Sequence, residues 1–120
     1  MAFVAPDPEK YGGEVVGDGQ CVAFVKEASG ATRTPLWKEG EKVRGAAIEI
    51  GTAIATFING QYPSHPHGNH AAIYVEQNDS GIVVWDQWLG QPVHKRTIRF
   101  KGDKCDDPSN NGDAFSVIET

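Results

Sequence analysis

A cysteine, a histidine and an aspartate are the residues of this sequence whose types and spacing could support a chemical reaction. Cys21 follows Gly19-Gln20 and begins an apolar segment, which places it in the first turn of a predicted helix. The unpaired N–H groups and the dipole of a helix N-terminus stabilise a thiolate, the nucleophilic form of cysteine. The amide of Gln20 lies beside the thiol and is a candidate donor to an oxyanion. On this segment alone, a cysteine that merely fills the core is the simpler interpretation.

His70 and Asp86 supply the second part of the argument. His70 opens an apolar stretch and Asp86 closes the next one, with the turn sequence Gln-Asn-Asp-Ser-Gly between them. Residues 70–76 and 82–88 are therefore predicted to form a β-hairpin. Because strand side chains alternate, positions 70 and 86 would lie on one face, either opposite each other or one diagonal step apart. Asp86 could then orient the imidazole, and the other ring nitrogen would meet the thiol.

The predicted helix that carries Cys21 has a clear beginning and end. Asp18 or Gly19 can cap its start, and Gly30 follows its last residue, Ser29. The apolar positions recur at helical spacing, which predicts one buried stripe made of Cys21, Phe24, Val25 and Ala28. Cys21 should therefore face inward.

The rest of the chain favours strands, with one further helix. A short helix is predicted around residues 38–44, between Pro35 and Gly45. Besides the hairpin, strands are predicted over residues 52–58, 93–100 and 114–118. A helix followed by an antiparallel sheet of about five strands is an α+β fold.

Length and charge limit the classes of protein to consider. The chain has 120 residues and a mass of 13.0 kDa, which suits a single domain over residues 1–120. The net charge is −5 and no basic cluster stands out, so we expect no nucleic-acid partner. No run approaches the roughly 20 apolar residues of a membrane span. The first residues lack the features of a secretory signal, so we expect synthesis in the cytoplasm without a signal peptide.

The order of these motifs resembles a known family. A helix that begins Gly19-Gln20-Cys21, a strand that begins at His70 and an acid on the next strand are similar to papain-like cell-wall amidases, closest to the cysteine, histidine-dependent amidohydrolase/peptidase (CHAP) group. The resemblance covers about residues 15–100. It implies a papain-like fold, Cys21 as nucleophile, His70 as base and Asp86 as the residue that orients the base. It also implies a peptidoglycan peptide substrate and no cofactor.

One departure from that pattern concerns the third catalytic role. Many members carry Asn two positions after the acid, whereas this chain has Trp88. The role is thereby open between Asp86 and Gln87. Because Gln87 should point to the opposite sheet face from His70, Asp86 is the better candidate. Gln20, Gln87 and Trp88 are expected to line the oxyanion and substrate site.

Two other classes of function fit some of the residues. In a non-catalytic binding module of the same fold, Cys21 would form a disulfide with Cys105. In a metal-binding protein, His65, His67 and His70 would bind zinc with Asp79 or Asp86. The histidine segment contains Pro66 and Gly68 and lacks regular ligand spacing, so we expect no metal site.

The expected place of action follows from the resemblance and from the missing export features. A housekeeping wall hydrolase usually needs export and tethering, and this sequence shows neither a signal nor an anchoring module. We therefore expect a toxin-like amidase that a contact-dependent secretion machine delivers into the periplasm of a neighbouring cell. A phage-type lysis enzyme is the alternative. A delivered toxin would also require a small immunity protein that blocks the cleft between Cys21 and His70.

Overall fold

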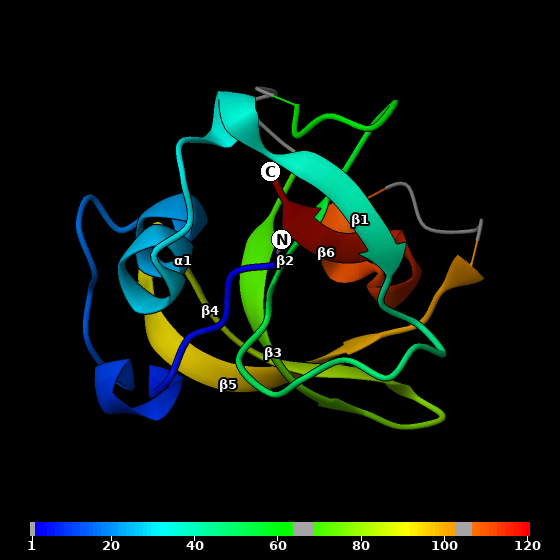
Figure 1. The fold of residues 1–120 in the computed structure, drawn as a ribbon. Coiled ribbons are helices and arrows are strands. Elements are labelled where there is room, and N and C mark those ends of the chain that lie inside the picture. Colours follow the sequence, from blue (N-terminus) through cyan, green and yellow to red (C-terminus); the bar gives the residue numbers. More distant parts are fainter. Residues whose placement is uncertain (1, 64–68, 103–106) are drawn as a thin grey trace.

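The computed structural model describes residues 2–63, 69–102 and 107–120, and its fold is α+β. One α-helix, α1 (Cys21–Ser29), packs against a six-stranded antiparallel sheet with the strand order β1-β6-β2-β3-β4-β5 (Figure 1). The strands are β1 (Lys38–Lys42), β2 (Ala53–Thr56), β3 (Ala71–Gln77), β4 (Gly81–Trp88), β5 (Gln91–Arg99) and β6 (Phe115–Glu119). Short 3-10 helices lie at η1 (Pro8–Tyr11), η2 (Thr34–Leu36), η4 (Pro108–Asn110) and η5 (Gly112–Ala114).

Helix α1 is the predicted helix that carries the cysteine. It begins at Cys21, and its N-cap is Gln20, not Asp18 or Gly19 as predicted. It ends at Ser29, before Gly30, whose left-handed backbone lets its N–H donate to the carbonyl of Lys26. Of the predicted stripe, Phe24, Val25 and Ala28 are buried, whereas Cys21 is only half-buried. This stripe packs mainly on β3 and β4. The packing holds the first turn of the helix over the strands that carry His70 and Asp86.

The hairpin predicted over residues 70–88 is confirmed as β3 and β4. Its turn closes where the N–H of Asn78 donates to the carbonyl of Gly81. Ile73 pairs with Trp85 and Tyr74 pairs with Val84, so positions 70 and 86 are one diagonal step apart. Both therefore lie on the same side of the ladder, as the alternation predicts.

The two faces of the sheet bury separate clusters. Along β3, Ala71 and Ile73 face the cluster that contains α1, whereas Ala72 and Tyr74 face a second cluster with Val84 and others. The first four residues of β3 are all buried, because the sheet is covered on both faces there. The strand that follows His70 is thus enclosed by side chains on both faces.

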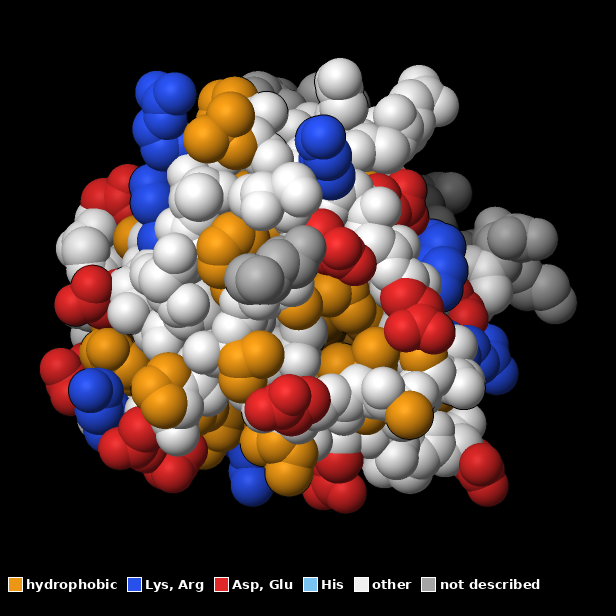
Figure 2. Space-filling view, in the orientation of Figure 1, with side chains coloured by type: hydrophobic (Ala, Val, Ile, Leu, Met, Phe, Trp, Pro, Cys, Tyr) orange, Lys and Arg blue, Asp and Glu red, His pale blue; other side chains and the backbone are white. Residues whose placement is uncertain are grey.

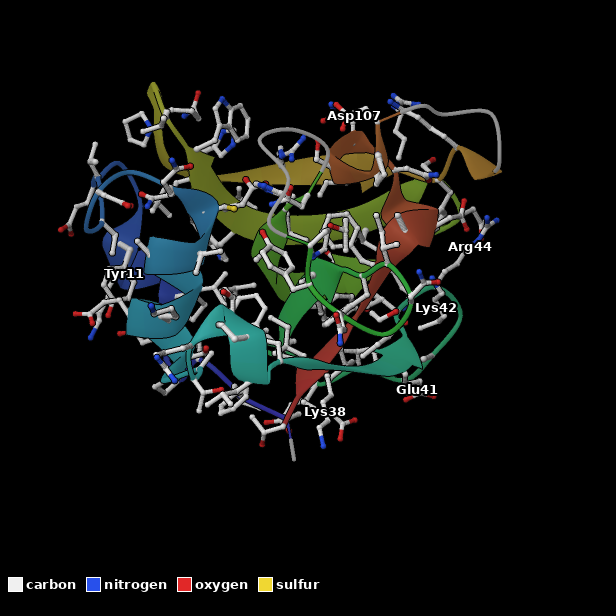
Figure 3. The ribbon with its side chains drawn as sticks, turned by 90° about the horizontal axis from the view of Figure 1, so that it is seen from above. Tyr11, Lys38, Glu41, Lys42, Arg44 and Asp107 are labelled. Atoms are coloured by element: carbon white, nitrogen blue, oxygen red, sulfur yellow. The ribbon has the colours of Figure 1, made fainter. Side chains whose placement is uncertain are left out.

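The helix predicted around residues 38–44 is wrong, since Lys38–Lys42 form strand β1, which raises the strand number from about five to six. β1 lies at the edge of the sheet and pairs with β6 (Figure 3). Its exposed lysine and glutamate side chains suit an edge strand, which charge protects from further pairing.

Charge is mixed on the molecular surface. Figure 2 shows a face on which acidic and basic side chains are interspersed among polar and apolar ones. In the part of the chain that the structure describes, no helix is long and apolar enough to cross a membrane.

Candidate active site

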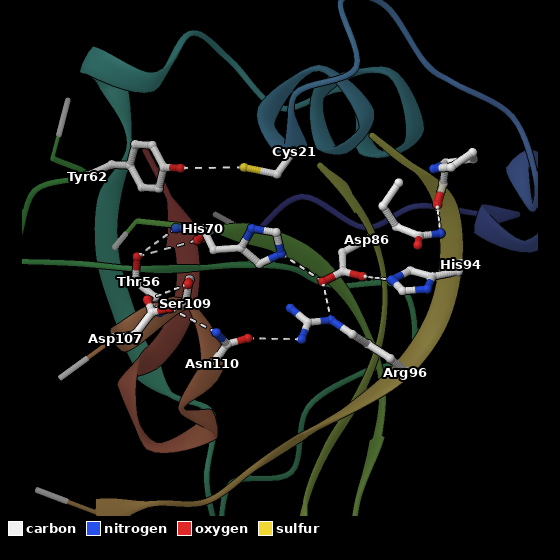
Figure 4. Close-up of polar contacts among 12 residues, drawn as sticks. Cys21, Thr56, Tyr62, His70, Asp86, His94, Arg96, Asp107, Ser109 and Asn110 are labelled. Carbon is white, nitrogen blue, oxygen red and sulfur yellow. Dashed lines mark hydrogen bonds and ion pairs between the residues drawn. The ribbon is translucent and has the colours of Figure 1, made fainter. Parts of the chain in front are cut away.

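The nucleophile candidate lies where the helix begins. Cys21 is half-buried and carries a free thiol, while Cys105 lies outside the described residues. The sulfur of Cys21 is 3.8 Å from the hydroxyl of Tyr62 (Figure 4). The ring of His70 and the backbone N–H of Ala71 are its further polar neighbours. The thiol therefore meets the base candidate at the start of β3.

The base candidate is held on two sides. The backbone N–H of His70 donates to the hydroxyl of Thr56 at 3.0 Å, and the N–H of Thr56 donates to the His70 carbonyl at 3.0 Å. On the ring, Nε2 lies 2.7 Å from Oδ2 of Asp86. Because Nε2 is engaged by the carboxylate, Nδ1 is the ring nitrogen left for the thiol. The structure thus brings Cys21, His70 and Asp86 together in the predicted order.

The electrostatics favour a thiolate beside an imidazolium. Burial by itself would raise the pKa of the Cys21 thiol, but the hydrogen bond to His70 and its positive charge outweigh burial, so the pKa lies below its ordinary value. Burial by itself would lower the pKa of His70, yet the bonds to Asp86 and Cys21 raise it to about 9. For Asp86, burial is again outweighed, here by His70 and Arg96, and its pKa is lowered.

Asp86 has two further basic neighbours that the sequence analysis missed. Nε of Arg96 donates to Oδ2 of Asp86 at 2.8 Å. Nε2 of His94 lies 3.1 Å from Oδ1 of Asp86, which is close enough for an ion pair if the ring is protonated. The two atoms form no hydrogen bond with each other, and neither has another hydrogen-bond partner. The Leu89-Gly90 turn pairs Trp88 with Gln91 and would by itself set Val93 opposite Asp86. A one-residue register shift between Asp86 and Trp88 instead sets His94 opposite Asp86 and Arg96 two positions further along, and no sequence pattern revealed that shift.

Gln87 occupies the other face of β4. Its side chain is fully buried, and its amide accepts from the N–H of Val16 and donates to the carbonyls of Val16 and Gln20. The expectation that Gln87 contacts substrate is therefore corrected, because a side chain with no exposed surface and no spare polar atom cannot meet a ligand in this conformation. Gln87 instead ties down the loop that leads into Cys21. Gln20, the residue that precedes Cys21, is exposed, and its expected role toward an oxyanion stays a prediction.

Trp88 lies at the rim of the site. It is 40% exposed, and its ring packs edge-on against His70 at 6.3 Å and His94 at 5.1 Å between centroids. The guanidinium of Arg96 stacks over the same ring at 4.9 Å. Trp88 thus packs against the two histidines and the arginine that surround Asp86, and part of its ring stays exposed.

Tyr62 and Asn69 are the other neighbours of the thiol that the sequence did not reveal. Nδ2 of Asn69 donates to the Tyr62 hydroxyl oxygen at 3.3 Å, which leaves the hydroxyl proton free to point at the sulfur. Burial and the nearby negative charge of Cys21 raise the pKa of Tyr62, so the phenol stays protonated. The hydroxyl is therefore a donor to the thiolate. No sequence pattern places residue 62 near residue 21.

The metal-binding alternative gains no support from the described residues. His65 and His67 lie outside them, and among the rest no group of three or more histidine, cysteine, aspartate or glutamate side chains is arranged to hold a metal ion. The third basic group on Asp86 is the guanidinium of Arg96, which binds no metal.

Comparison with known proteins gives one consistent family. Residues 1–118 match the model of the family described as domesticated amidase effector 2. A type VI secretion amidase effector 2 protein of Salmonella typhi is 39% identical over 94% of this chain and 91% of its own, and the domesticated amidase effector 2 of Ixodes scapularis is 39% identical over 98% and 85%. A solved structure of the type 6 secretion amidase effector 2 (Tae2) superposes with a TM-score of 0.86 at 36% identity, over 98% of this chain and 94% of that one. The chain belongs to the domesticated amidase effector 2 family.

Proposed function

We propose that this protein is a cysteine amidase that hydrolyses an amide bond in peptidoglycan peptides and acts as an antibacterial effector. The observation that carries the proposal is the contact of Cys21, His70 and Asp86 at one end of the sheet. The amidase effector names of its relatives agree with that chemistry. We regard the arrangement as papain-like, with the nucleophile at a helix start packed on an antiparallel sheet, in a single domain over residues 1–120.

The first half of the reaction forms a thioester. The Cys21 thiolate attacks the carbonyl carbon, and the carbonyl electrons move to oxygen as an oxyanion. We expect the backbone N–H of Cys21 and the exposed amide of Gln20 to donate to that oxygen. When the intermediate collapses, the C–N bond breaks and His70 Nδ1 gives its proton to the leaving amine. The product at this stage is an acyl-Cys21 thioester and a neutral imidazole.

The second half returns the enzyme to its starting state. His70 Nδ1, now neutral, takes a proton from water as the oxygen attacks the thioester carbonyl. The C–S bond then breaks, which releases a carboxylic acid and restores the thiolate beside the imidazolium. Throughout, Asp86 holds Nε2 and keeps Nδ1 aimed at the reacting atoms.

The biological context is an effector that works outside the cell that makes it. We propose delivery into the periplasm of a neighbouring bacterium by a type VI secretion machine, in line with the name of the Salmonella typhi relative. A producing cell would then need a small immunity protein that covers the exposed side of the Cys21–His70 pair. Trp88 is the large apolar side chain at that rim and would be a contact for such an inhibitor.

Incubation of purified muropeptides with the protein, followed by mass spectrometry, tests the proposal. Hydrolysis of an amide adds one water, so the expected result is a pair of fragments whose masses sum to the substrate plus 18 Da. Cys21→Ala should yield no such fragments, whereas Cys105→Ala should yield them at the wild-type rate. Intact muropeptides with folded wild-type protein, or cleavage that persists in Cys21→Ala, would refute the function.

A further inference from the structure

Asp86 carries more positive charge around it than the orientation of one histidine requires. The carboxylate has no exposed surface and meets His70 from β3 and both His94 and Arg96 from β5. The ring of His70 in turn faces the Cys21 thiol from α1, with Tyr62 beyond the sulfur. Among the described residues, these are the titratable and charged side chains that contact Asp86 and His70.

The two strongest contacts fall on the same oxygen. Nε2 of His70 lies 2.7 Å from Oδ2 of Asp86, and Nε of Arg96 lies 2.8 Å from that atom. A guanidinium keeps its positive charge at every pH that the protein meets, so it neutralises part of the carboxylate charge permanently. The attraction of the carboxylate for the His70 proton is thereby weakened.

Arg96 is also fixed in place away from Asp86. Its Nη1 donates to Oδ1 of Asn110 at 3.3 Å, and its guanidinium stacks on Trp88. Its side chain is 21% exposed. Because contacts on three sides define its position, the guanidinium can hold the plane of the Asp86 carboxylate as well as reduce its charge.

Both effects matter for the proposed reaction, on which this inference rests. His70 must hold a proton beside the thiolate, then release it to the leaving amine, then accept one from water. A carboxylate without Arg96 would stabilise the imidazolium more strongly through Nε2 and so oppose the release of the proton from Nδ1. We propose that Arg96 is a positioning residue, which shares Oδ2 of Asp86 with His70 and so keeps the imidazolium aligned yet able to give up its proton.

Direct titration of the histidine rings by NMR tests the charge effect without any substrate. In the wild-type protein, His70 should titrate near pH 9. Arg96→Gln removes the charge, so the His70 midpoint should move upward by about 1 pH unit. Arg96→Lys keeps the charge and should leave the midpoint near the wild-type value. Arg99→Gln is the matched control, since Arg99 lies exposed on the same strand and should not move it.

Kinetics of muropeptide cleavage test the alignment effect. Arg96→Lys cannot reproduce the planar Nε contact, so kcat should fall roughly tenfold with KM little changed. A folded Arg96→Gln protein whose His70 midpoint stays at the wild-type value overturns the inference. If Arg96→Gln does not fold, the lysine variant decides, and a wild-type kcat in that variant overturns it.

Failure of the proposed function looks different from failure of this inference. A wild-type protein that cleaves no muropeptide refutes the amidase proposal, while the NMR midpoints still report whether Arg96 weakens the hold of Asp86 on the His70 proton. Conversely, an active wild type with unmoved midpoints in Arg96→Gln and wild-type kcat in Arg96→Lys leaves the amidase intact and removes the role of Arg96.

Discussion

Asp86 and Gln87 are neighbours on β4, and both are fully buried polar residues, yet they serve opposite faces of the sheet. Asp86 meets basic side chains, those of His94 and Arg96 from β5 and that of His70 directly before β3. Gln87 meets only backbone groups, all of them in the loop before α1. One residue thus acts on the base and the other on the approach to the nucleophile.

The contrast between the partners of Asp86 and Gln87 shows how a small domain aligns two reactive groups that come from distant elements. The base needs a charge partner, because a buried imidazolium is stable only beside a carboxylate. The nucleophile needs a fixed helix start, because its thiolate depends on the direction of the helix N-terminus. Two successive strand residues supply both, since their side chains alternate between the faces. Changes at the two positions should therefore affect different measurements.

The largest expected effect is at His70, the proposed base. His70→Ala removes the base, and kcat for muropeptide cleavage should fall at least about a thousandfold, as far as it falls in Cys21→Ala. The double variant should be no worse than either single variant, because the two residues act as a unit. Substantial activity in His70→Ala, with the fold verified by circular dichroism, would contradict the assignment.

The next largest effect is expected at Asp86, the partner of His70. Asp86→Asn keeps the shape but loses the charge, so it should lower kcat about a hundredfold, less than the loss of His70. The His70 midpoint measured by NMR should fall well below 9, because the carboxylate that raises it is gone. An unchanged midpoint would mean that Asp86 does not set the protonation of His70.

The pH dependence of the rate and of the stability also tests the pairing of His70 with Asp86. The folded pKa of His70, about 9, lies above its ordinary value of 6.5, so its contribution to stability is complete below 6.5 and is lost as the pH rises through about 9. Above that pH, kcat/KM should fall about tenfold per pH unit, and the melting temperature should fall over the same range. A rate that keeps rising from pH 8 to 10 would show that no imidazolium is required.

A smaller effect is expected at the hydroxyl that meets the thiol. Tyr62→Phe removes one hydrogen bond to a charged sulfur and should reduce kcat about tenfold. The pH at which iodoacetamide alkylates Cys21 should move upward, because the thiolate loses a donor. Phe57, whose ring packs on Tyr62, supplies the control: Phe57→Leu changes packing there without removing a donor. A thiol titration that does not respond to Tyr62→Phe would contradict the donor role.

The smallest effect on rate belongs to Gln87. Gln87→Ala removes three buried hydrogen bonds at about 1 kcal/mol each, so the free energy of unfolding should fall by roughly 2–3 kcal/mol, while kcat should fall only a few-fold. Gln77→Ala is the matched control. Gln77 likewise bonds the backbone of Val43, Gly45 and Ala46, in a loop remote from the thiol, so its loss should cost stability without any change in kcat.

The relative losses of kcat in the Asp86 and Gln87 variants test whether the two residues have been assigned to the correct faces of β4. If a folded Gln87→Ala protein loses more kcat than Asp86→Asn, then the residue that orients His70 has been assigned to the wrong face. Chemical denaturation and single-turnover kinetics on the same preparations separate the two readouts.

Local patterns were enough to predict helix α1, the β3–β4 hairpin and the contact of His70 with Asp86. Helical spacing, a glycine after the last residue of the helix and strand alternation each depend on a few neighbouring residues. They can therefore be recognised without the fold. Strand β1 was mispredicted as a helix because its stability comes from pairing with β6, far away along the chain. Its own residues carry charges at no clear period.

The tertiary structure alone decided the surroundings of the three central residues. Tyr62 reaches Cys21 across 41 positions, and Gln87 reaches Val16 across 71, contacts that depend on how α1 lies on the sheet. Arg96 and His94 meet Asp86 because the Leu89-Gly90 turn and a one-residue register shift between Asp86 and Trp88 together fix the pairing of β5. Without that shift both side chains would turn to the other face. The types of the reacting residues are thus a local property of the chain, whereas their charge balance depends on strand register and packing.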